Sequence, residues 1–333
     1  MVEQVQKENK IVVLGSASQD YFFKLDRMPV IGETLDAHGF EKSLGGKGAN
    51  QAICVAKLGT RCEMLVQLGN DDPGHRYVKE FQKHGVETTH AKLLDGVDTG
   101  QAYILALKDG ENSIIINGAA NCAYDANMTE LDPSWASAIR SSRVLMLQRE
   151  IPEYVNIAAA KVAREAGTTT ILDIGGRDEP LSEELLSLVD MISPNETELD
   201  RVVGKKAHNY EEAKQGLLDF VTDSETKRIK RDLTVVLKMG AEGSAFLKYH
   251  KDTNTVEEVY LPAFEFKNFP ELKLVDTTGA GDCFTAGFAV KLNEGATMQE
   301  AILHGNKAGF LAITKFGAGP AIPTLEEIQT HFK

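Results

Sequence analysis

Short, wholly apolar runs recur along the chain, and stretches with helical spacing separate them. Such runs are typical of strands buried in a parallel sheet, and their alternation with helices predicts an α/β fold whose sheet is covered on both faces. The expected strands lie near residues 11–15, 64–68, 144–148, 170–174, 191–193 and 234–238. The expected helices lie near residues 53–58, 73–84, 152–166, 182–188, 196–203, 211–222, 282–294 and 298–315.

Two segments depart from this alternation. Residues 21–44 mix polar and apolar side chains with period-two character between Pro29, Gly32 and Gly39, and residues 98–118 hold two apolar runs around Asp109-Gly110, a strong hairpin signal. We expect both segments to pair into one small sheet, a lid inserted into a chain-wide domain of residues 11–333. Residues 245–274 are also expected to be β, and the charged stretch 223–232 is expected to be a solvated loop.

Composition narrows the possible partners. The 333 residues carry a net charge of −13, which disfavours binding to nucleic acid or to an anionic membrane. The four cysteines form no Cys-x-x-Cys pair, so neither a zinc site nor a redox motif is indicated. The polar N-terminus lacks an apolar signal core, and no apolar run approaches the ~18 residues of a membrane span. A cytoplasmic protein is the default expectation, with the nucleus or an organelle as alternatives.

The segment 274–284 carries the clearest chemical signal. An apolar lead-in is followed by the small residues Gly279-Ala280-Gly281, then by Asp282, then by an apolar helical run. Glycines allow close approach of a ligand, and a helix that begins there directs free N–H groups and its positive dipole end at an anion. An acid on that first turn can accept a proton. The order predicts a phosphoryl-transfer site; the alternative is an ordinary strand-to-helix turn.

Other strand ends carry weaker signals. The P-loop and the Gly-x-Gly-x-x-Gly motif are both absent from the sequence, so phosphates would have to be bound in another way. Asp20 is either a substrate-binding residue or an ordinary loop acid. Asn195 and Glu198 could face a magnesium–phosphate cluster or could form a capping box, and the two roles are compatible. The turn from Gly240 to Gly243 is equally compatible with phosphate contact and with plain turn chemistry.

Two motifs together resemble the signatures of the ribokinase-like (pfkB) carbohydrate kinases: Gly45-Gly46-Lys47-Gly48-Ala49-Asn50-Gln51-Ala52 and Asp276-Thr277-Thr278-Gly279-Ala280-Gly281-Asp282. Further matches occur in the family's order, at Gly15-Ser16 with Asp20 and at 148–152, 194–196 and 314–318, so the resemblance covers about residues 11–325. It implies a three-layer α/β/α core with a mostly parallel central sheet and a small β-sheet lid. It also implies transfer of phosphate from ATP to a sugar, and the form of the first motif favours the 5-hydroxyl of D-ribose.

The resemblance further implies a role for the residue at each corresponding position, whether or not its type matches. Asp282 would be the general base, beside an anion hole of N–H groups from Gly279, Ala280 and Gly281. The implied sugar-binding residues are Ser18, Asp20, Gly46, Lys47, Asn50, Glu150 and Asp282. The implied ATP-binding residues are Asn195, Lys238, Gly240, Gly243, Gly281 and Asn306. Glu198 would hold Mg²⁺ through water, and the implied K⁺ site comprises Asp276, Thr278, Ala312, Lys315, Gly317 and Ala321. A homodimer formed through the lid is also implied.

Three positions depart from the family pattern. Ser18 stands where asparagine is common, Lys238 where a small hydroxyl residue is common, and Ala321 where a serine is common. These differences leave open another sugar or a nucleoside such as adenosine as the acceptor. A non-catalytic protein that senses sugars or nucleotides is the third alternative, and the intact turn before Asp282 argues against it.

Overall fold

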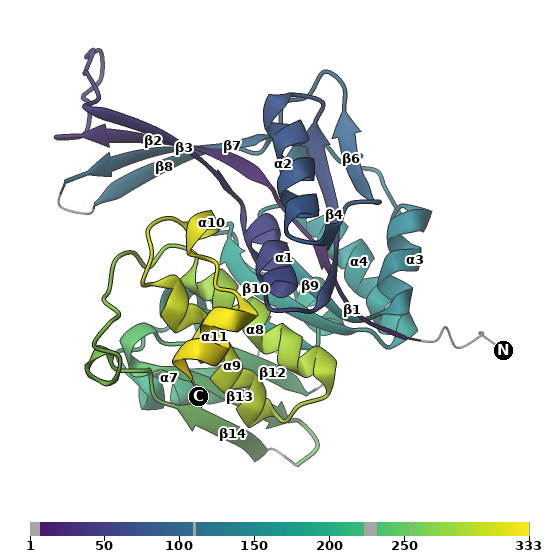
Figure 1. Ribbon diagram of the computed structural model, residues 1–333. Helices are drawn as coiled ribbons and strands as arrows, with labels where there is room; N and C mark the ends of the chain where they lie inside the picture. The colour runs from purple at the N-terminus through teal and green to yellow at the C-terminus, as the bar shows by residue number, and fades with distance from the viewer. Residues whose placement is uncertain (1–6, 109–110, 223–231, 254, 333) are drawn as a thin grey trace.

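The computed structural model describes residues 7–108, 111–222, 232–253 and 255–332, and these form two sheets of unequal size (Figure 1). The larger has ten strands in the order β14-β13-β12-β11-β10-β9-β1-β4-β5, with β6 also paired to β4. All its pairings are parallel except those that join β12, β13 and β14. Its strands are β1 (Glu8–Leu14), β4 (Arg61–Gly69), β5 (Val86–Glu87), β6 (Ala91–Leu94), β9 (Ser142–Arg149), β10 (Thr169–Gly176), β11 (Met191–Ser193), β12 (Leu233–Lys238), β13 (Ser244–His250) and β14 (Thr255–Leu261).

Alternate side chains of the central strands enter two separate cores, one on each face of the large sheet. In β1, Ile11 and Val13 belong to one core, and Val12 and Leu14 to the other, all fully buried. The first core is covered by α1 (Lys47–Lys57), α2 (Asp72–Lys83), α8 (Ala280–Glu294), α9 (Met298–Ala312) and α11 (Leu325–His331). The second is covered by α3 (Pro133–Ser141), α4 (Glu153–Ala166), α5 (Glu183–Leu188), α6 (Glu196–Val203) and α7 (Tyr210–Thr222). The result is a three-layer α/β/α core.

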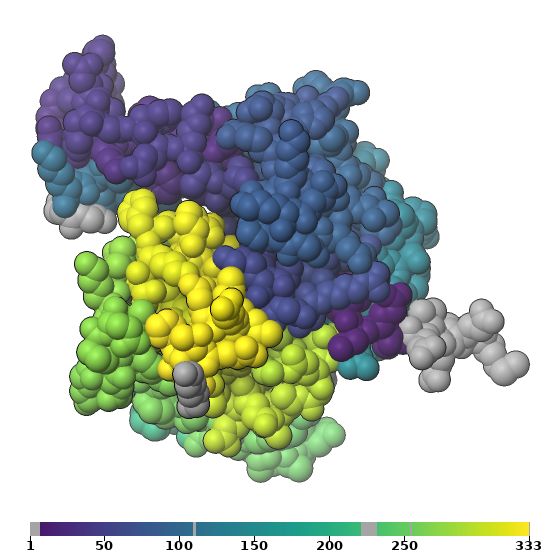
Figure 2. All heavy atoms as spheres, viewed as in Figure 1, coloured from purple at the N-terminus to yellow at the C-terminus, as the bar shows by residue number. Residues whose placement is uncertain are grey.

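The smaller sheet has four strands in the order β3-β2-β7-β8 and projects from the main body (Figures 1 and 2). The central pair β2 and β7 is parallel, and both outer pairs are antiparallel. The outer strand β8 exposes Ile114, Ile115 and Ile116. The bounds are β2 (Ser18–Leu25), β3 (Gly39–Gly45), β7 (Gly100–Leu107) and β8 (Asn112–Asn117).

The predicted α/β fold, its mostly parallel sheet and the second small sheet are confirmed. The predicted strand region 245–274 is too long, because β structure ends at Leu261. Beyond it, Phe264 and Phe269 pack against Phe310. The helix expected over 298–315 ends at Ala312, and the next carbonyl, that of Ile313, accepts backbone hydrogen bonds from residues 275 and 276. Helix α3 and strands β5 and β6 were not predicted.

Some expectations lie outside what the structure describes. The predicted Asp109-Gly110 turn and residues 223–231 of the charged stretch are outside the described residues. Among the described residues, no helix combines the length and apolar character that crossing a membrane requires. All four cysteines are free thiols, and Cys54, Cys62 and Cys283 are buried.

Candidate active site

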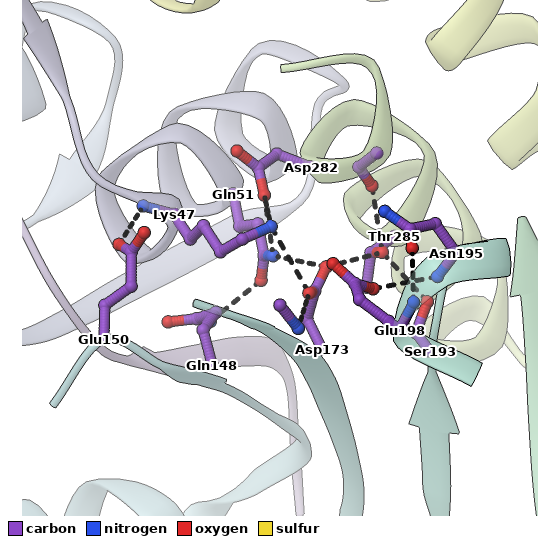
Figure 3. Close-up of polar contacts among 12 residues, drawn as sticks. Lys47, Gln51, Gln148, Glu150, Asp173, Ser193, Asn195, Glu198, Asp282 and Thr285 are labelled. Atoms are coloured by element: carbon purple, nitrogen blue, oxygen red, sulfur yellow. Dashed lines mark hydrogen bonds and ion pairs between the residues drawn. The ribbon is translucent and has the colours of Figure 1, made fainter. Parts of the chain in front are cut away.

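The N-termini of α1 and α8 meet the carboxyl ends of β9, β10 and β11 at one edge of the large sheet (Figure 3). This edge is the usual ligand site of open α/β folds. The side chains gathered there are mostly polar, although the strands that carry them are apolar. Both signature motifs therefore contribute to one site, although more than two hundred residues separate them in the sequence.

Helix α8 begins with the predicted glycine turn. Gly279 is the N-cap with φ +79°, and a Cβ at this position would lie 3.0 Å from the Cα of Ala318, so the turn requires glycine. The Ala280 N–H donates to the carbonyl of Thr277 at 3.2 Å, within the turn. The N–H groups of the first helical turn, including that of Gly281, have no partner earlier in the helix. The turn therefore offers the amide donors and helix dipole that favour an anion.

Asp282 lies on this first turn and is only 5% exposed. Its carboxylate accepts hydrogen bonds from Asn50 Nδ2 at 3.0 Å and Gln51 Nε2 at 3.2 Å, and Lys47 Nζ is 3.4 Å away. All three donors come from α1. Gln51 is itself oriented by Gln148, whose Nε2 donates to Gln51 Oε1 at 2.8 Å. The Asp282 carboxylate is thus held in one orientation and faces the first signature motif, Gly45–Ala52.

Asp173, near the end of β10, is a site residue that the sequence analysis missed. It is fully buried, and its carboxylate is 3.0 Å from Lys238 Nζ and 3.4 Å from Lys47 Nζ. Burial alone would raise the pKa of Asp173, but the two ammonium groups lower it to about 2. Burial would likewise lower the pKa of Lys47, but Asp173 and Asp282 raise it well above its usual value. A lone acid inside the apolar run 170–174 was the available signal.

The residues that the resemblance assigns to the sugar, here called the acceptor side, lie on β2, at the start of α1 and directly after β9. Glu150 accepts a hydrogen bond from the Lys47 N–H at 2.9 Å and one from Ser16 Oγ at 2.5 Å. A Cβ at Gly45 would lie 2.0 Å from Asp20 Oδ2, so this glycine is what allows the Asp20 carboxylate to lie against β3. Burial, and then the charge of Glu150, raise the pKa of Asp20 to about 7. Two carboxylates therefore lie near the start of α1, which follows Gly46 directly.

Ser18 opens β2, and its side chain is bound within the protein. Its Oγ accepts from Asn121 Nδ2 at 3.2 Å, and the same amide donates to the Ala17 carbonyl at 3.0 Å. Tyr77 Oη donates to the Ser18 carbonyl at 2.8 Å. Asn121 and Tyr77 were not predicted as site residues, because their contribution depends on packing between distant segments. Ser18 is therefore held at the junction of the two sheets.

The residues that the resemblance assigns to ATP and Mg²⁺, here called the donor side, begin at the N-terminus of α6. Asn195 accepts from the Glu198 N–H and Glu198 Oε2 accepts from the Asn195 N–H, both at 2.8 Å, so the capping-box alternative is confirmed. The other oxygen, Oε1, remains directed at Gly175, where a Cβ would lie only 2.5 Å from it. Within the described residues, no group of three His, Cys, Asp or Glu side chains is arranged to hold a metal ion.

Three further donor-side residues lie near β12 and α9. Gly240 begins a short 3₁₀ turn and Gly243 follows its end with φ +114°. A Cβ at Gly243 would lie 2.2 Å from the Leu261 carbonyl oxygen, so turn geometry alone accounts for this glycine. Asn306 Oδ1 accepts from Ser244 Oγ at 2.8 Å. Its amide nitrogen is buried without a hydrogen-bond partner among the described residues. A polar atom of this kind is available to a ligand.

The predicted cation residues lie on two adjoining segments. Asp276 Oδ1 accepts from the N–H and Oγ1 of Thr278 at 2.9 and 2.7 Å, and Oδ2 accepts from the Gly317 N–H at 2.9 Å. The Ala312 carbonyl accepts from the Lys315 N–H at 3.3 Å, while the Lys315 side chain pairs with Glu327. Ala321 is fully buried and supplies no polar side chain. Asp276 thus ties the turn before Gly279 to the C-terminal segment.

Residues 8–325 match the model of the pfkB family of carbohydrate kinases, and the chain belongs to that family. Among curated relatives, ribokinase of Arabidopsis thaliana is 36% identical over 97% of this chain and 81% of its own length. Ribokinase of Staphylococcus aureus is 33% identical over 96% of this chain and 99% of its own. A solved structure of Arabidopsis thaliana ribokinase complexed with ribose and ATP has a TM-score of 0.86 and 34% identity, covering 97% of this chain and 98% of that one.

Proposed function

We propose that this chain catalyses the ATP-dependent phosphorylation of D-ribose at its 5-hydroxyl, with ribose 5-phosphate and ADP as products. One observation carries the proposal: Asp282, at the glycine turn of α8, is held by Lys47 and Asn50 of the first signature motif. A base, an anion-binding helix end and sugar-type polar groups therefore converge. The relatives named ribokinase, and the related structure complexed with ribose and ATP, support ribose as the acceptor.

The reaction follows from the positions of these groups. Asp282 accepts the proton of the ribose 5-hydroxyl while the hydroxyl oxygen attacks the γ-phosphorus of ATP. The bond between the γ-phosphorus and the bridging oxygen then breaks, and that oxygen leaves with ADP. Catalysis of phosphoryl transfer depends mainly on positioning and charge stabilisation. The N–H groups of Gly279 and Gly281 would stabilise the transferred group, with Ala280 joining them when its N–H turns from Thr277. Asp282 also binds the sugar through the hydroxyl that it deprotonates.

The remaining sugar contacts are assigned to the acceptor side. Asp20 and Glu150 offer carboxylate oxygens, Lys47 and Asn50 offer donors, and Gly46 permits close approach of the backbone. Opposed donors and acceptors of this kind suit vicinal hydroxyl groups, because each hydroxyl can donate and accept. Ser18 acts mainly by holding the start of β2, since its hydroxyl already contacts Asn121.

ATP is assigned to the donor side. Its phosphates would contact Lys238, Gly240 and the α8 N-terminus near Gly281, and Asn195 and Gly243 would line the nucleotide. The unpartnered amide of Asn306 fits a hydrogen bond to the base. Mg²⁺ is commonly bound by one or two carboxylates together with phosphates and water, and Glu198 Oε1 fits that limited role. Mg²⁺ would supply charge neutralisation on the phosphates.

A monovalent cation is assigned to the Asp276 loop. Asp276, Thr278 and the carbonyls of Ala312, Lys315 and Gly317 offer oxygen atoms of the type that K⁺ binds, whereas Ala321 offers only its backbone. The hydrogen bond between Gly317 and Asp276 supports this assignment, because it already joins the two segments. Replacing K⁺ with Na⁺ at constant ionic strength is expected to lower turnover, and an unchanged rate would contradict a K⁺ site.

The small sheet is assigned the role of a lid over the sugar, within a single chain-wide domain. Exclusion of water by such a cover limits hydrolysis of ATP.

The exposed apolar side chains of the small sheet, Phe40 and Ile114–Ile116, support a homodimer formed through this sheet. Sedimentation of the intact chain tests the dimer, and a monomer at all concentrations would contradict it. The free thiols support a reducing, cytoplasmic location.

An acceptor panel tests the proposed function. D-ribose, other pentoses, hexoses and adenosine are each assayed with ATP and Mg²⁺, with and without K⁺, and kcat/KM is compared. We expect the highest value for ribose. A higher value for adenosine would replace ribose with a nucleoside, and absence of turnover with every acceptor would favour a sensing protein.

A further inference from the structure

The side-chain cluster at the centre of the site contains two acids and two lysines, namely Asp173, Asp282, Lys47 and Lys238. Asp173 contacts both lysines and is fully buried, and each of its oxygens accepts more than one hydrogen bond. The four formal charges cancel. Interactions between buried charges are strong because water screens them little, so the position of each lysine depends on what else its partner binds.

Lys238 reaches Asp173 from the donor side. Its backbone N–H bonds the Pro194 carbonyl, and its main chain forms a β-bridge with Asn195. Its Nζ lies 3.0 Å from Asp173 and 3.7 Å from where a Cβ on Gly281 would stand. The ammonium group therefore lies beside the α8 N-terminus, within reach of any anion bound there.

Lys47 reaches the same carboxylate from the acceptor side. Its Nζ is 3.4 Å from Asp173 Oδ1 and 3.4 Å from Asp282 Oδ1, so the two acids share it equally (Figure 3). Gln51 reinforces this symmetry, because its Nε2 lies 3.3 Å from Asp173 and 3.2 Å from Asp282. A change in the charge around Asp173 would therefore shift Lys47 with respect to Asp282.

We propose that Asp173 is a positioning residue that couples the two substrate sites through Lys238 and Lys47, an inference that rests on the proposed kinase function. A phosphate group at the α8 N-terminus competes with Asp173 for Lys238. Asp173, left with one ammonium partner, then draws Lys47 away from Asp282. The freed oxygen of Asp282 accepts the hydrogen bond of the acceptor hydroxyl, so bound nucleotide strengthens sugar binding and prepares the base.

The test measures this coupling by calorimetry on the full chain. The Kd of ribose is determined with and without Mg²⁺ and a non-hydrolysable ATP analogue, for wild type, Asp173→Asn, Lys238→Met and the double variant. In wild type we expect the analogue to tighten ribose binding by about fivefold or more, the lower end of typical coupling between sites. In each variant the change is expected to fall below about twofold.

Kinetics separate positioning from a general structural role. If Asp173 acts on nucleotide binding through Lys238, the KM for ATP should be the same in Lys238→Met and in the double variant. Glu63→Gln is the matched control, since it breaks a buried ion pair with Lys10 (2.8 Å) far from the site, and it should retain the coupling. Loss of coupling in this control would overturn the inference. Asp173→Asn leaves Lys47 and Lys238 without this partner; should it fail to fold, Lys238→Met alone decides.

A first assay of wild-type turnover with ribose distinguishes failure of the proposed kinase function from failure of the role proposed for Asp173. No turnover would overturn the proposed function and this inference with it. Normal turnover with equal ribose affinities in the presence and absence of the analogue, or full coupling in Lys238→Met, would overturn the role of Asp173 alone.

Discussion

The site has a proposed acceptor half, which would bind the sugar, and a proposed donor half, which would bind ATP. The two halves present different kinds of chemical groups. The proposed acceptor half gathers charged and amide side chains from β2, α1 and the residue that follows β9, namely Asp20, Asn50 and Glu150 among others. The donor half consists mainly of helix N-termini and glycine turns at α6, β12 and α8, with Lys238 as its buried cation. A sugar must be recognised by the pattern of its hydroxyl groups, whereas a phosphate can be held by backbone N–H groups. Under the proposed function, acceptor specificity therefore depends on side chains, whereas phosphate binding depends on backbone shape.

The largest expected effect is on Asp282, where the two halves meet. Asp282→Asn keeps the shape but removes the proton acceptor, so kcat should fall by at least about 10²-fold, the usual scale for a general base. The KM for ribose should change much less, because Asn50 and Lys47 remain. Steady-state kinetics measure both, and retention of most of the turnover would contradict the assignment of the base.

A second substitution tests whether backbone shape matters in the donor half. Gly279→Ala places a Cβ at φ +79° and 3.0 Å from Ala318, so the turn must shift. We expect kcat to fall by about tenfold or more, because loss of one donor from an anion hole costs about 10²–10³. Gly167→Ala is the matched control: it has φ +65° at the end of α4 and open space around it. Equal loss of activity in both variants would show that strain alone is responsible.

The acceptor half is expected to respond to pH through Asp20, whose pKa is raised to about 7 by burial and by Glu150. The ionised carboxylate accepts stronger hydrogen bonds, so the KM for ribose should fall severalfold between about pH 6 and about pH 8. Asp20→Asn should abolish this dependence, while the KM for ATP serves as the internal control. A ribose KM with the same pH profile in wild type and variant would contradict the role of Asp20.

The same shift predicts the opposite trend in stability. The pKa of Asp20 is higher in the folded chain than its ordinary value of 3.8, so the folded state holds this proton more tightly. Its contribution to the free energy of unfolding is present below about pH 4 and is lost as pH rises through about 7. The difference in stability between wild type and Asp20→Asn should therefore shift in favour of the variant at higher pH, and denaturant titrations at several pH values measure it.

The smallest expected effect concerns the donor half. Asn195→Ala removes the capping box of α6 and should lower the free energy of unfolding by about 1 kcal/mol. Thr297→Ala removes the capping box of α9 and should cost a similar amount. Only the Asn195 variant should also raise the KM for ATP. Thermal unfolding and kinetics of both variants are compared. If the KM for ATP were the same in both, Asn195 would serve only as a helix cap.

Local patterns were sufficient to predict the α/β alternation, both β segments of the small sheet and the glycine turn before Asp282. Each of these depends on short-range rules: apolar runs for buried strands, period-two alternation for the small sheet, and small residues before a helix. The ends of elements were less predictable. Helix α9 ends at Ala312 because the carbonyl of Ile313 bonds a segment almost forty residues earlier, and no local pattern carries that information.

The missed site residues share the same explanation. Asp173 lies in a strand that is otherwise apolar, and its importance appears only when Lys47 and Lys238 arrive from distant parts of the chain. Asn121 and Tyr77 contact the backbone near Ser18 through packing between elements. By contrast, the capping box at Asn195 was predicted correctly from the local sequence. A role of Asn195 in ligand binding depends on which groups lie opposite the cap, and the local sequence does not contain that information.

The chain passes between the two sheets at points next to the acceptor residues. Ser18 and Asp20 lie at the start of β2, and Gly45 ends β3 two residues before Lys47. Any recombination that exchanged the small sheet between relatives would therefore transfer Asp20 with it, while Lys47, Asn50 and the phosphate-binding turn would stay behind. Under the proposed function, acceptor preference would therefore be inherited in part with the small sheet. Exchange of this one exposed sheet would change the preference and leave the residues assigned to ATP unaltered.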